Sequence, residues 1–247
     1  MRKKTKKSKK RIIILSIILM AVLALVASCV IYFNIYYKAD ATLVEAYLPS
    51  GALVELDDGS LALIPQNARV GFIFYPGAKV EHKAYLPLMS LLYERGIACV
   101  IAKMPANFAI FAPNKADKLF NELPTLERWY IGGHSLGGSM ACSYASKNAD
   151  KLAGVILLAS YSTEDLSDTD LDIISIYGSL DKVLNMENYQ ENRTNLGDVA
   201  EHIIDGGNHA YFGAYGEQRG DGEAQVTRDE QLRETVQYIC DKILADA

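Results

Sequence analysis

Short apolar runs alternate with amphipathic stretches along most of this 247-residue chain, and this alternation constrains the fold more than any other feature. Six runs are nearly continuous in apolar residues, at positions 70–75, 97–103, 128–133, 153–159, 172–178 and 200–205. Such runs are typical of parallel strands that are buried on both faces. Helical patterns fill the gaps at residues 83–96, 114–123, 139–148 and 228–247. The repetition predicts an α/β fold, with a mostly parallel, doubly wound sheet and helices on both faces.

A β-hairpin is expected ahead of the first of these strands. Residues 52–56 and 61–66 are apolar and flank the sequence DDGS, which predicts a turn at Asp58-Gly59. The chain contains no repeat of fixed period and no low-complexity linker. We therefore expect one domain at residues 39–247, with its ligand site beyond the carboxyl ends of the parallel strands.

The N-terminal segment differs in character from the rest. Residues 1–11 hold eight of the 25 Lys and Arg residues and no acidic one, and residues 12–33 carry no charge. The uncharged run is long enough to cross a hydrocarbon core about 30 Å thick as a helix. Because basic flanks stay inside, we expect a cytoplasmic tail at residues 1–11, a transmembrane helix at 12–33 and an extracytoplasmic domain in the cell membrane.

Two alternatives for this segment remain open, and both also export the domain. It has the features of a cleaved secretory signal peptide, and the sequence VASC ending at Cys29 resembles a lipoprotein processing site. We favour the uncleaved signal anchor, because the residues after Cys29 prolong the apolar run. In this interpretation the membrane is a partner through the N-terminal helix.

Charge and cysteine content exclude several functions for the exported part. All 30 acidic residues lie after residue 11, so the domain is strongly acidic and poorly suited to bind nucleic acid through its surface. Cys99, Cys142 and Cys240 are widely spaced and form no CxxC pair, so neither a disulfide framework nor a zinc site is indicated. We expect them to be buried apolar residues.

Residues 132–138 read GGHSLGG and lie between a predicted strand and a predicted helix. A serine at such a junction sits on a sharp turn, and Gly133 and Gly137 allow strand and helix to approach without a side chain in the way. The pattern therefore predicts that Ser135 is an exposed nucleophile. The alternative is a glycine-rich helix start with a capping serine.

A serine hydroxyl needs a neighbouring imidazole to take its proton. Among the four histidines only His209 follows the last predicted strand, so we predict it as the base. His202 lies inside that strand, and His134 adjoins the serine. His82 starts the first crossover helix, where we expect it to be solvated, although a place in the pocket is an alternative.

Asp181 is the predicted acid of the triad. It follows the strand at residues 172–178 through a short turn, where its carboxylate would hold the imidazole tautomer. Asp205 is the closest rival, but it more naturally ends the preceding strand. Acyl transfer passes through a tetrahedral intermediate whose oxyanion needs backbone N–H donors. The candidate donors are the N–H of Leu136 and one from Ala78 or Gly77.

With these residues placed, the chain resembles the α/β-hydrolase superfamily, and within it a small, lid-poor bacterial esterase-like group. The segments YPGAKVEHKAY, KMPANFAIF, GGHSLGG, YGSLDKV and GGNHAYFGAYG carry the resemblance in this order. It implies an α/β-hydrolase fold, Ser135 as nucleophile, Asp181 as acid and His209 as base. It also implies an oxyanion hole at Leu136 and the Gly77–Ala78 loop, no metal or organic cofactor, and carboxylic ester hydrolysis.

Two departures from the family pattern bear on the substrate. The early loop lacks HGGG, and only a short segment joins the strands that end at residue 159 and begin at 172, so no large cap is expected. Specificity would then come from two loops. In residues 107–114, the side chains Phe108, Ile110 and Phe111 either line an acyl pocket or pack under their own loop. In residues 210–223, the side chains Tyr211, Phe212 and Tyr215 shape the leaving-group side, or the glycines there give plain flexibility.

The sequence thus predicts a membrane-anchored, extracytoplasmic serine hydrolase, a carboxylesterase that acts on small or medium esters through a Ser-His-Asp catalytic triad and an acyl-enzyme. An acyltransferase or amidase with the same triad is one alternative. A hydrolase fold retained as a non-catalytic binding module is another.

Overall fold

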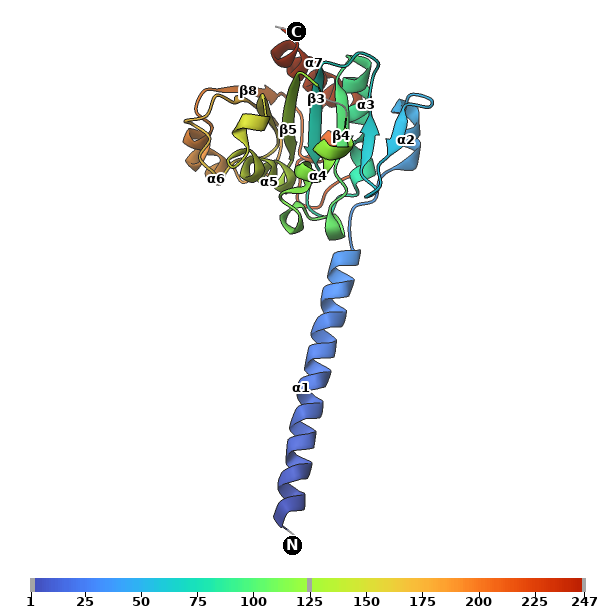
Figure 1. Ribbon diagram of the computed structural model, residues 1–247, viewed down its shortest axis with the longest axis vertical. Coiled ribbons are helices and arrows are strands. Elements are labelled where there is room, and N and C mark those ends of the chain that lie inside the picture. Colours follow the sequence, from blue (N-terminus) through green and yellow to red (C-terminus); the bar gives the residue numbers. More distant parts are fainter. Residues whose placement is uncertain (1–2, 124–125, 246–247) are drawn as a thin grey trace. The chain divides into compact units, whose positions relative to one another are not determined.

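The computed structural model describes residues 3–123 and 126–245 of the chain (Figure 1). It divides into two compact units, Met1–Tyr36 and Tyr37–Ala247. In the first unit, helix α1 (Lys3–Asn34) contains the stretch Lys9–Asn34, which is long and apolar enough to cross a membrane, with a mean hydropathy of 3.0 over its most apolar 18 residues. A signal sequence has the same properties. The helix continues into the basic residues of the expected tail, whose residues 1–2 lie outside the described part.

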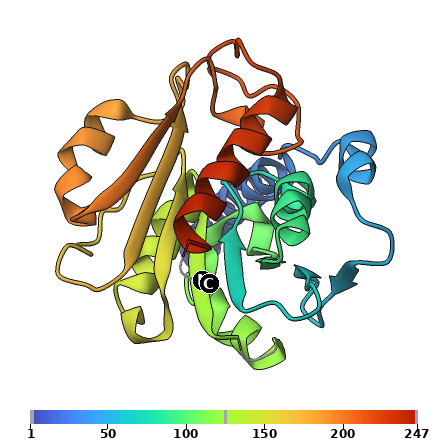
Figure 2. The same ribbon diagram turned by 90° about the horizontal axis from the view of Figure 1, so that it is seen from above.

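The second unit is built on one eight-stranded sheet with the order β1-β2-β4-β3-β5-β6-β7-β8. The strands are β1 (Leu53–Glu55), β2 (Leu61–Leu63), β3 (Val70–Tyr75), β4 (Ala98–Ile101), β5 (Arg128–His134), β6 (Gly154–Leu158), β7 (Asp172–Gly178) and β8 (Val199–Ile204). Strands β3 to β8 are parallel, whereas the hairpin β1–β2 adds antiparallel to β4. The hairpin and β8 lie at opposite ends of the sheet (Figure 2). The predicted sheet and hairpin are confirmed.

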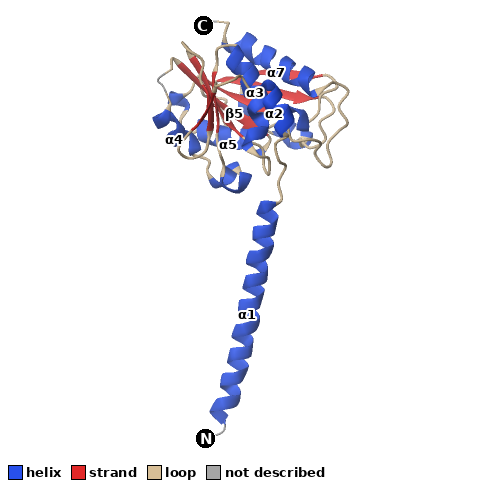
Figure 3. Cartoon of the chain, turned by 90° about the vertical axis from the view of Figure 1, so that its right-hand side faces the viewer, coloured by secondary structure: helices blue, strands red, loops and turns tan. Residues whose placement is uncertain are grey.

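Helices cover both faces of the sheet (Figure 3). They are α2 (Ala41–Tyr47), α3 (Leu86–Glu94), α4 (Lys115–Glu122), α5 (Leu136–Ala145), α6 (Met186–Glu191) and α7 (Arg228–Ile243). Two hydrophobic clusters result, one under α3 and α7 and the other under α4 and α5. Strand β3 explains the uninterrupted apolar runs: Phe72 and Phe74 enter the first cluster, while Ile73 and Tyr75 enter the second.

Two helices were not predicted from the sequence. Helix α2 lies in the connection before the hairpin, where Asp40 caps it by accepting hydrogen bonds from the N–H groups of Thr42 (3.0 Å) and Leu43 (3.1 Å). Helix α6 lies between β7 and β8 and is capped in the same way by Asn185. Both are shorter than eight residues, so neither produces a clear apolar periodicity.

The ends of three predicted helices also differ from the structure. Residues His82–Tyr85 form a 3₁₀ turn, and α3 begins at Leu86, with the proline at position 87 in its first turn, where a missing N–H costs nothing. Helix α5 begins directly after Ser135, three residues earlier than predicted. Helix α7 ends at Ile243, and residues 246–247 of the predicted helix lie outside the described part.

The connection between β6 and β7 contains no helix or strand at residues 159–171. The expectation that no large cap is inserted there is confirmed. Cys99, Cys142 and Cys240 are buried free thiols, as expected, while Cys29 is exposed in α1.

Candidate active site

Ser135 occupies the turn that joins β5 to α5, with φ 52° and ψ −127°. A positive φ is strained for a residue other than glycine and is held only when the surrounding structure enforces it. Here the N–H of Ser135 donates to the carbonyl oxygen of Leu158 at 3.0 Å, which ties the turn to β6. The strand therefore ends in the sharp turn expected of a nucleophile between strand and helix.

The glycines on either side of Ser135 are required by close packing. A Cβ on Gly133 would lie 2.3 Å from the carbonyl oxygen of Tyr75, and one on Gly137 would lie 2.0 Å from the same atom. A backbone oxygen in β3 cannot move aside as a flexible side chain can. The missing side chains thus bring the first turn of α5 against the end of β3, as the sequence predicted.

Asp181 and His209 form a buried pair. The Nδ1 atom of His209 lies 2.8 Å from Oδ2 of Asp181, and both side chains are 1 % exposed. The other carboxylate oxygen, Oδ1, accepts the N–H groups of Val183 and Leu184, each at 2.8 Å. Three contacts therefore fix the carboxylate, which in turn fixes the imidazole ring.

Ser135, Asp181 and His209 all follow the carboxyl ends of parallel strands, namely β5, β7 and β8. The Nε2 atom of His209 is buried and has no hydrogen-bond partner among the described residues. The bond from the serine hydroxyl to this atom is thus not formed here. Hydrogen bonds in active sites are often long without substrate and tighten when it binds, so the missing bond does not count against the pair. Because Nε2 has no partner among the described residues, it is available as a hydrogen-bond acceptor.

The rival residues have other partners. Asp205 is exposed and accepts the hydroxyl of Ser179 at 3.2 Å, and His202 in β8 lies 2.8 Å from the carboxylate of Glu234. His82 is 8 % exposed, so the expectation of a solvated residue is wrong. The 3₁₀ turn places it inward, and burial lowers its pKa.

The loop that carries His209 is held by Asp221, a residue that was not predicted from the sequence. Its carboxylate accepts the N–H of Ala210 at 2.8 Å and that of His209 at 3.3 Å. A Cβ on the adjacent Gly222 would lie 1.8 Å from the carbonyl oxygen of Leu180, so this loop packs directly on the loop of Asp181. At this glycine, close packing rather than flexibility explains the residue type. An aspartate between two glycines after the histidine was the available signal.

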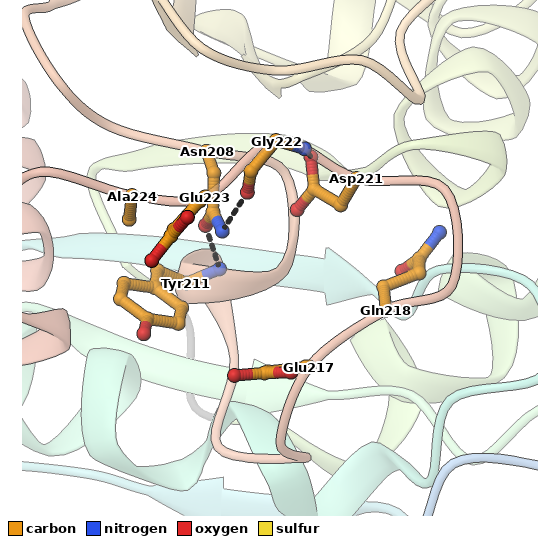
Figure 4. Close-up of a pocket in the computed structure, with 8 residues that line it drawn as sticks. All are labelled: Asn208, Tyr211, Glu217, Gln218, Asp221, Gly222, Glu223 and Ala224. Carbon is orange, nitrogen blue, oxygen red and sulfur yellow. Dashed lines mark hydrogen bonds between the residues drawn. The ribbon is translucent and has the colours of Figure 1, made fainter.

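The same loop borders a cavity of about 400 Å³ (Figure 4). Its lining is polar and includes three carboxylates: the residues are Asn208, Tyr211, Glu217, Gln218, Asp221, Gly222, Glu223 and Ala224. Of the aromatic residues expected on the leaving-group side, only Tyr211 faces this cavity. Phe212 and Tyr215 are buried in the hydrophobic core instead.

The candidate oxyanion donors differ in availability. Leu136 is the first residue of α5, and first-turn N–H groups have no acceptor within the helix. Among the described residues, no hydrogen bond engages the N–H of Ala78. The N–H of Gly77 donates to the hydroxyl of Tyr85 at 3.1 Å, which argues against Gly77 as a donor to substrate.

A smaller cavity of about 220 Å³ opens beside the serine. Its lining mixes hydroxyl, amide and apolar groups: the residues are Ser135, Leu136, Ser139, Ala159, Ser160, Tyr161, Val183, Leu184 and Asn185. The loop with Phe108, Ile110 and Phe111 does not contribute to it. None of the three lines this pocket, so the acyl-pocket alternative is wrong. Ile110 and Phe111 are each 54 % exposed, whereas Phe108 is half-buried and its ring centroid lies 5.9 Å from that of Phe111, so packing within the loop is met only in part.

The model of the alpha/beta hydrolase family matches residues 71–233. No curated protein sequence matches the chain. Among solved structures, Est1E from Butyrivibrio proteoclasticus is similar with a TM-score of 0.57 and 13 % identity, over 78 % of this chain and 98 % of its own.

Two further structures give the same fold. A predicted CIB-like hydrolase from Thermoplasma acidophilum has a TM-score of 0.54 and 15 % identity, over 76 % of this chain and 96 % of its own. The alpha/beta hydrolase MGS-MChE2, from the metagenome of lagoon sediments of Mar Chica, Morocco, has a TM-score of 0.57 and 12 % identity, over 77 % and 98 %. The family match, the sheet order and the turn at Ser135 agree, and the chain belongs to the alpha/beta hydrolase family.

Proposed function

We propose that this hydrolase is a membrane-anchored, extracytoplasmic serine carboxylesterase that acts on small or medium esters. One observation carries the proposal. The buried pair of Asp181 and His209 leaves a ring nitrogen without a partner among the described residues, at the same sheet edge as the strained turn of Ser135. An imidazole nitrogen that is free to accept a proton, at the sheet edge that also carries a serine hydroxyl, is the arrangement that acyl transfer needs.

The proposed reaction has two halves. Ser135 Oγ attacks the ester carbonyl carbon while Nε2 of His209 takes the hydroxyl proton, and Asp181 stabilises the imidazolium through Nδ1–H. The N–H groups of Leu136 and Ala78 donate to the oxyanion. The C–O bond to the alcohol then breaks, and His209 returns its proton to the leaving oxygen. In the second half His209 takes a proton from water, which attacks the acyl carbon. The bond to Oγ of Ser135 then breaks, Oγ receives the proton from His209, and the acid is released.

The size of the pocket beside Ser135 supports a small acyl group. A volume of about 220 Å³ is below the 300–1,000 Å³ usual for drug-sized ligands. The β6–β7 connection also favours a small acyl group, because it contains no cap that could enclose a long acyl chain. Est1E has been solved with ferulic acid, a carboxylic acid, bound to it, which makes carboxylic esters the first substrates to test.

The anchoring part of the proposal rests on the apolar helix Lys9–Asn34 and on the basic residues before it. Their order favours a cytoplasmic N-terminus and an exported hydrolase unit. Processing at Cys29 as a lipoprotein is the alternative for the same segment.

The full chain, solubilised in detergent, should react with a fluorophosphonate probe at Ser135 only. Labelling should be lost in Ser135→Ala and His209→Ala variants that keep the wild-type circular dichroism spectrum. A p-nitrophenyl ester series should then give the highest kcat/KM for short acyl chains. Folded wild-type protein without label would instead support a binding module, and faster product release with added alcohols or amines would support an acyltransferase.

A further inference from the structure

A buried chain of hydrogen bonds joins the early loop to the serine turn. The N–H of Gly77 donates to the hydroxyl oxygen of Tyr85 at 3.1 Å, and this oxygen lies 2.9 Å from Nδ1 of His134. Tyr85 is 0 % exposed and His134 is 1 % exposed. Solvent therefore does not compete for these bonds, and their donors and acceptors must satisfy one another.

The direction of these hydrogen bonds follows from the groups around the hydroxyl of Tyr85. The oxygen of Tyr85 accepts from Gly77, and among the described residues Nδ1 of His134 is the one acceptor offered to its single proton, so we assign the hydroxyl as donor to Nδ1. Burial raises the pKa of Tyr85, so the phenol keeps that proton. Burial and the neighbouring His209 hold the pKa of His134 well below its usual range, so the ring stays neutral. With Nδ1 as acceptor, the ring proton lies on Nε2, which is buried and has no hydrogen-bond partner among the described residues.

The two outer residues of this hydrogen-bonded series, Gly77 and His134, adjoin groups that the proposed reaction uses. Gly77 precedes Ala78, and His134 precedes Ser135, while the rings of His134 and His209 lie 4.3 Å apart between centroids. The contact is close, since a Cβ on Gly77 would lie 2.8 Å from Nδ1 of His134. The bonds thus connect the loop of one candidate oxyanion donor with the turn of the nucleophile.

The early loop needs such a restraint, because it is strained. Lys79 has φ 58°, a conformation that a non-glycine residue keeps only when other contacts enforce it. Its N–H donates to the carbonyl oxygen of Asn107 at 2.8 Å on one side, and Tyr85 holds Gly77 on the other. Ala78 lies between these two fixed points, with its own N–H unused by any described residue.

We propose that Tyr85 and His134 are positioning residues that hold the Gly77–Ala78 loop so that the N–H of Ala78 is directed at the oxyanion. This inference rests on the proposed serine hydrolase function. Oxyanion donors stabilise the transition state only when they are fixed in advance, and loss of one donor lowers kcat by about 10²- to 10³-fold. Tyr85 touches no substrate in this scheme, so its effect is on the geometry of the donor.

The test compares two buried tyrosine hydroxyls in the full-length protein. Tyr85→Phe removes the acceptor of Gly77, whereas Tyr189→Phe removes a hydroxyl that lies 2.9 Å from the Oγ of Ser175 and is 1 % exposed. We expect Tyr85→Phe to lower kcat about 10- to 100-fold on an acetyl ester, with KM within twofold of wild type. Tyr189→Phe should keep both constants within twofold, although both variants lower Tm.

Two further measurements separate positioning from a merely structural role. Affinity for a boronic acid transition-state analogue should fall in Tyr85→Phe by the same factor as kcat/KM. In His134→Asn the amide oxygen can replace Nδ1 as acceptor, so this variant should keep more kcat than His134→Leu. If Tyr85→Phe keeps kcat within twofold, or if the two His134 variants lose kcat equally, the inference is overturned. Failure of the wild type to take the fluorophosphonate label would overturn the proposed function instead.

Discussion

Replacing Asp181 by Asn tests the triad more sharply than removing the carboxylate, because the structure determines how the amide must turn. One oxygen of Asp181 accepts two backbone N–H groups, at 2.8 Å each, and the other faces Nδ1 of His209 at 2.8 Å. The first oxygen therefore faces two N–H donors, those of Val183 and Leu184, and the second faces one, Nδ1–H of His209. The amide oxygen therefore takes the first position, and the NH₂ group is turned toward His209.

An NH₂ group in that position can only donate, so Nδ1 of His209 must become an acceptor and its proton moves to Nε2. That tautomer cannot take the proton of Ser135. For serine hydrolases with this type of triad, the change lowers kcat by about 10⁴-fold. This factor corresponds to about 5.5 kcal/mol of transition-state free energy.

The assay is steady-state hydrolysis of p-nitrophenyl acetate by the full chain, together with the rate of fluorophosphonate labelling. Asp205→Asn is the matched control, because Asp205 is exposed and, among the described residues, accepts one hydrogen bond, from the hydroxyl of Ser179. We expect it to stay within twofold of wild type. If Asp181→Asn keeps more than a tenth of kcat, or if Asp205→Asn loses as much, the assignment of the acid is refuted.

Three further predictions concern stability and anchoring. Gly137→Ala should lower the free energy of unfolding in urea by about 3 kcal/mol or more, since its Cβ would lie 2.0 Å from a backbone oxygen. The control Gly96→Ala should lower it by about 1 kcal/mol, because its Cβ would meet no atom within 4 Å and only its φ of 86° is unfavourable. Because burial holds the pKa of His134 low, only the unfolded chain takes up its proton, and stability should fall below about pH 6.5 by up to about 1.4 kcal/mol per pH unit for this residue. Unfolding at pH 7.5 and 5.5 should show a smaller loss in His134→Asn. Cys29→Ser should leave the protein in the membrane fraction and its mass unchanged except for the substitution, and loss of membrane retention would favour the lipoprotein.

Several expectations failed for reasons that the tertiary structure makes clear. His82 is polar and begins a helical segment, yet the 3₁₀ turn before Pro87 places it inside. Ile110 and Phe111 are apolar in sequence, yet the path of their loop leaves both more than half exposed. In each case the local pattern was read correctly, but the direction of the side chain depended on the backbone path of a loop, which has no periodicity.

The sequence alone determined the alternation of strands and helices, and with it the sheet and the hairpin, because buried parallel strands require apolar residues on both faces. It also determined the turn at Ser135, because glycines at fixed spacing are needed where a helix meets a strand closely. Only the tertiary structure decided which groups surround that serine. Asp221 supports the loop of His209, and Tyr85 occupies the N–H of Gly77. These contacts join segments far apart in the chain, and hydrogen bonds between such segments depend on folding rather than on any local pattern.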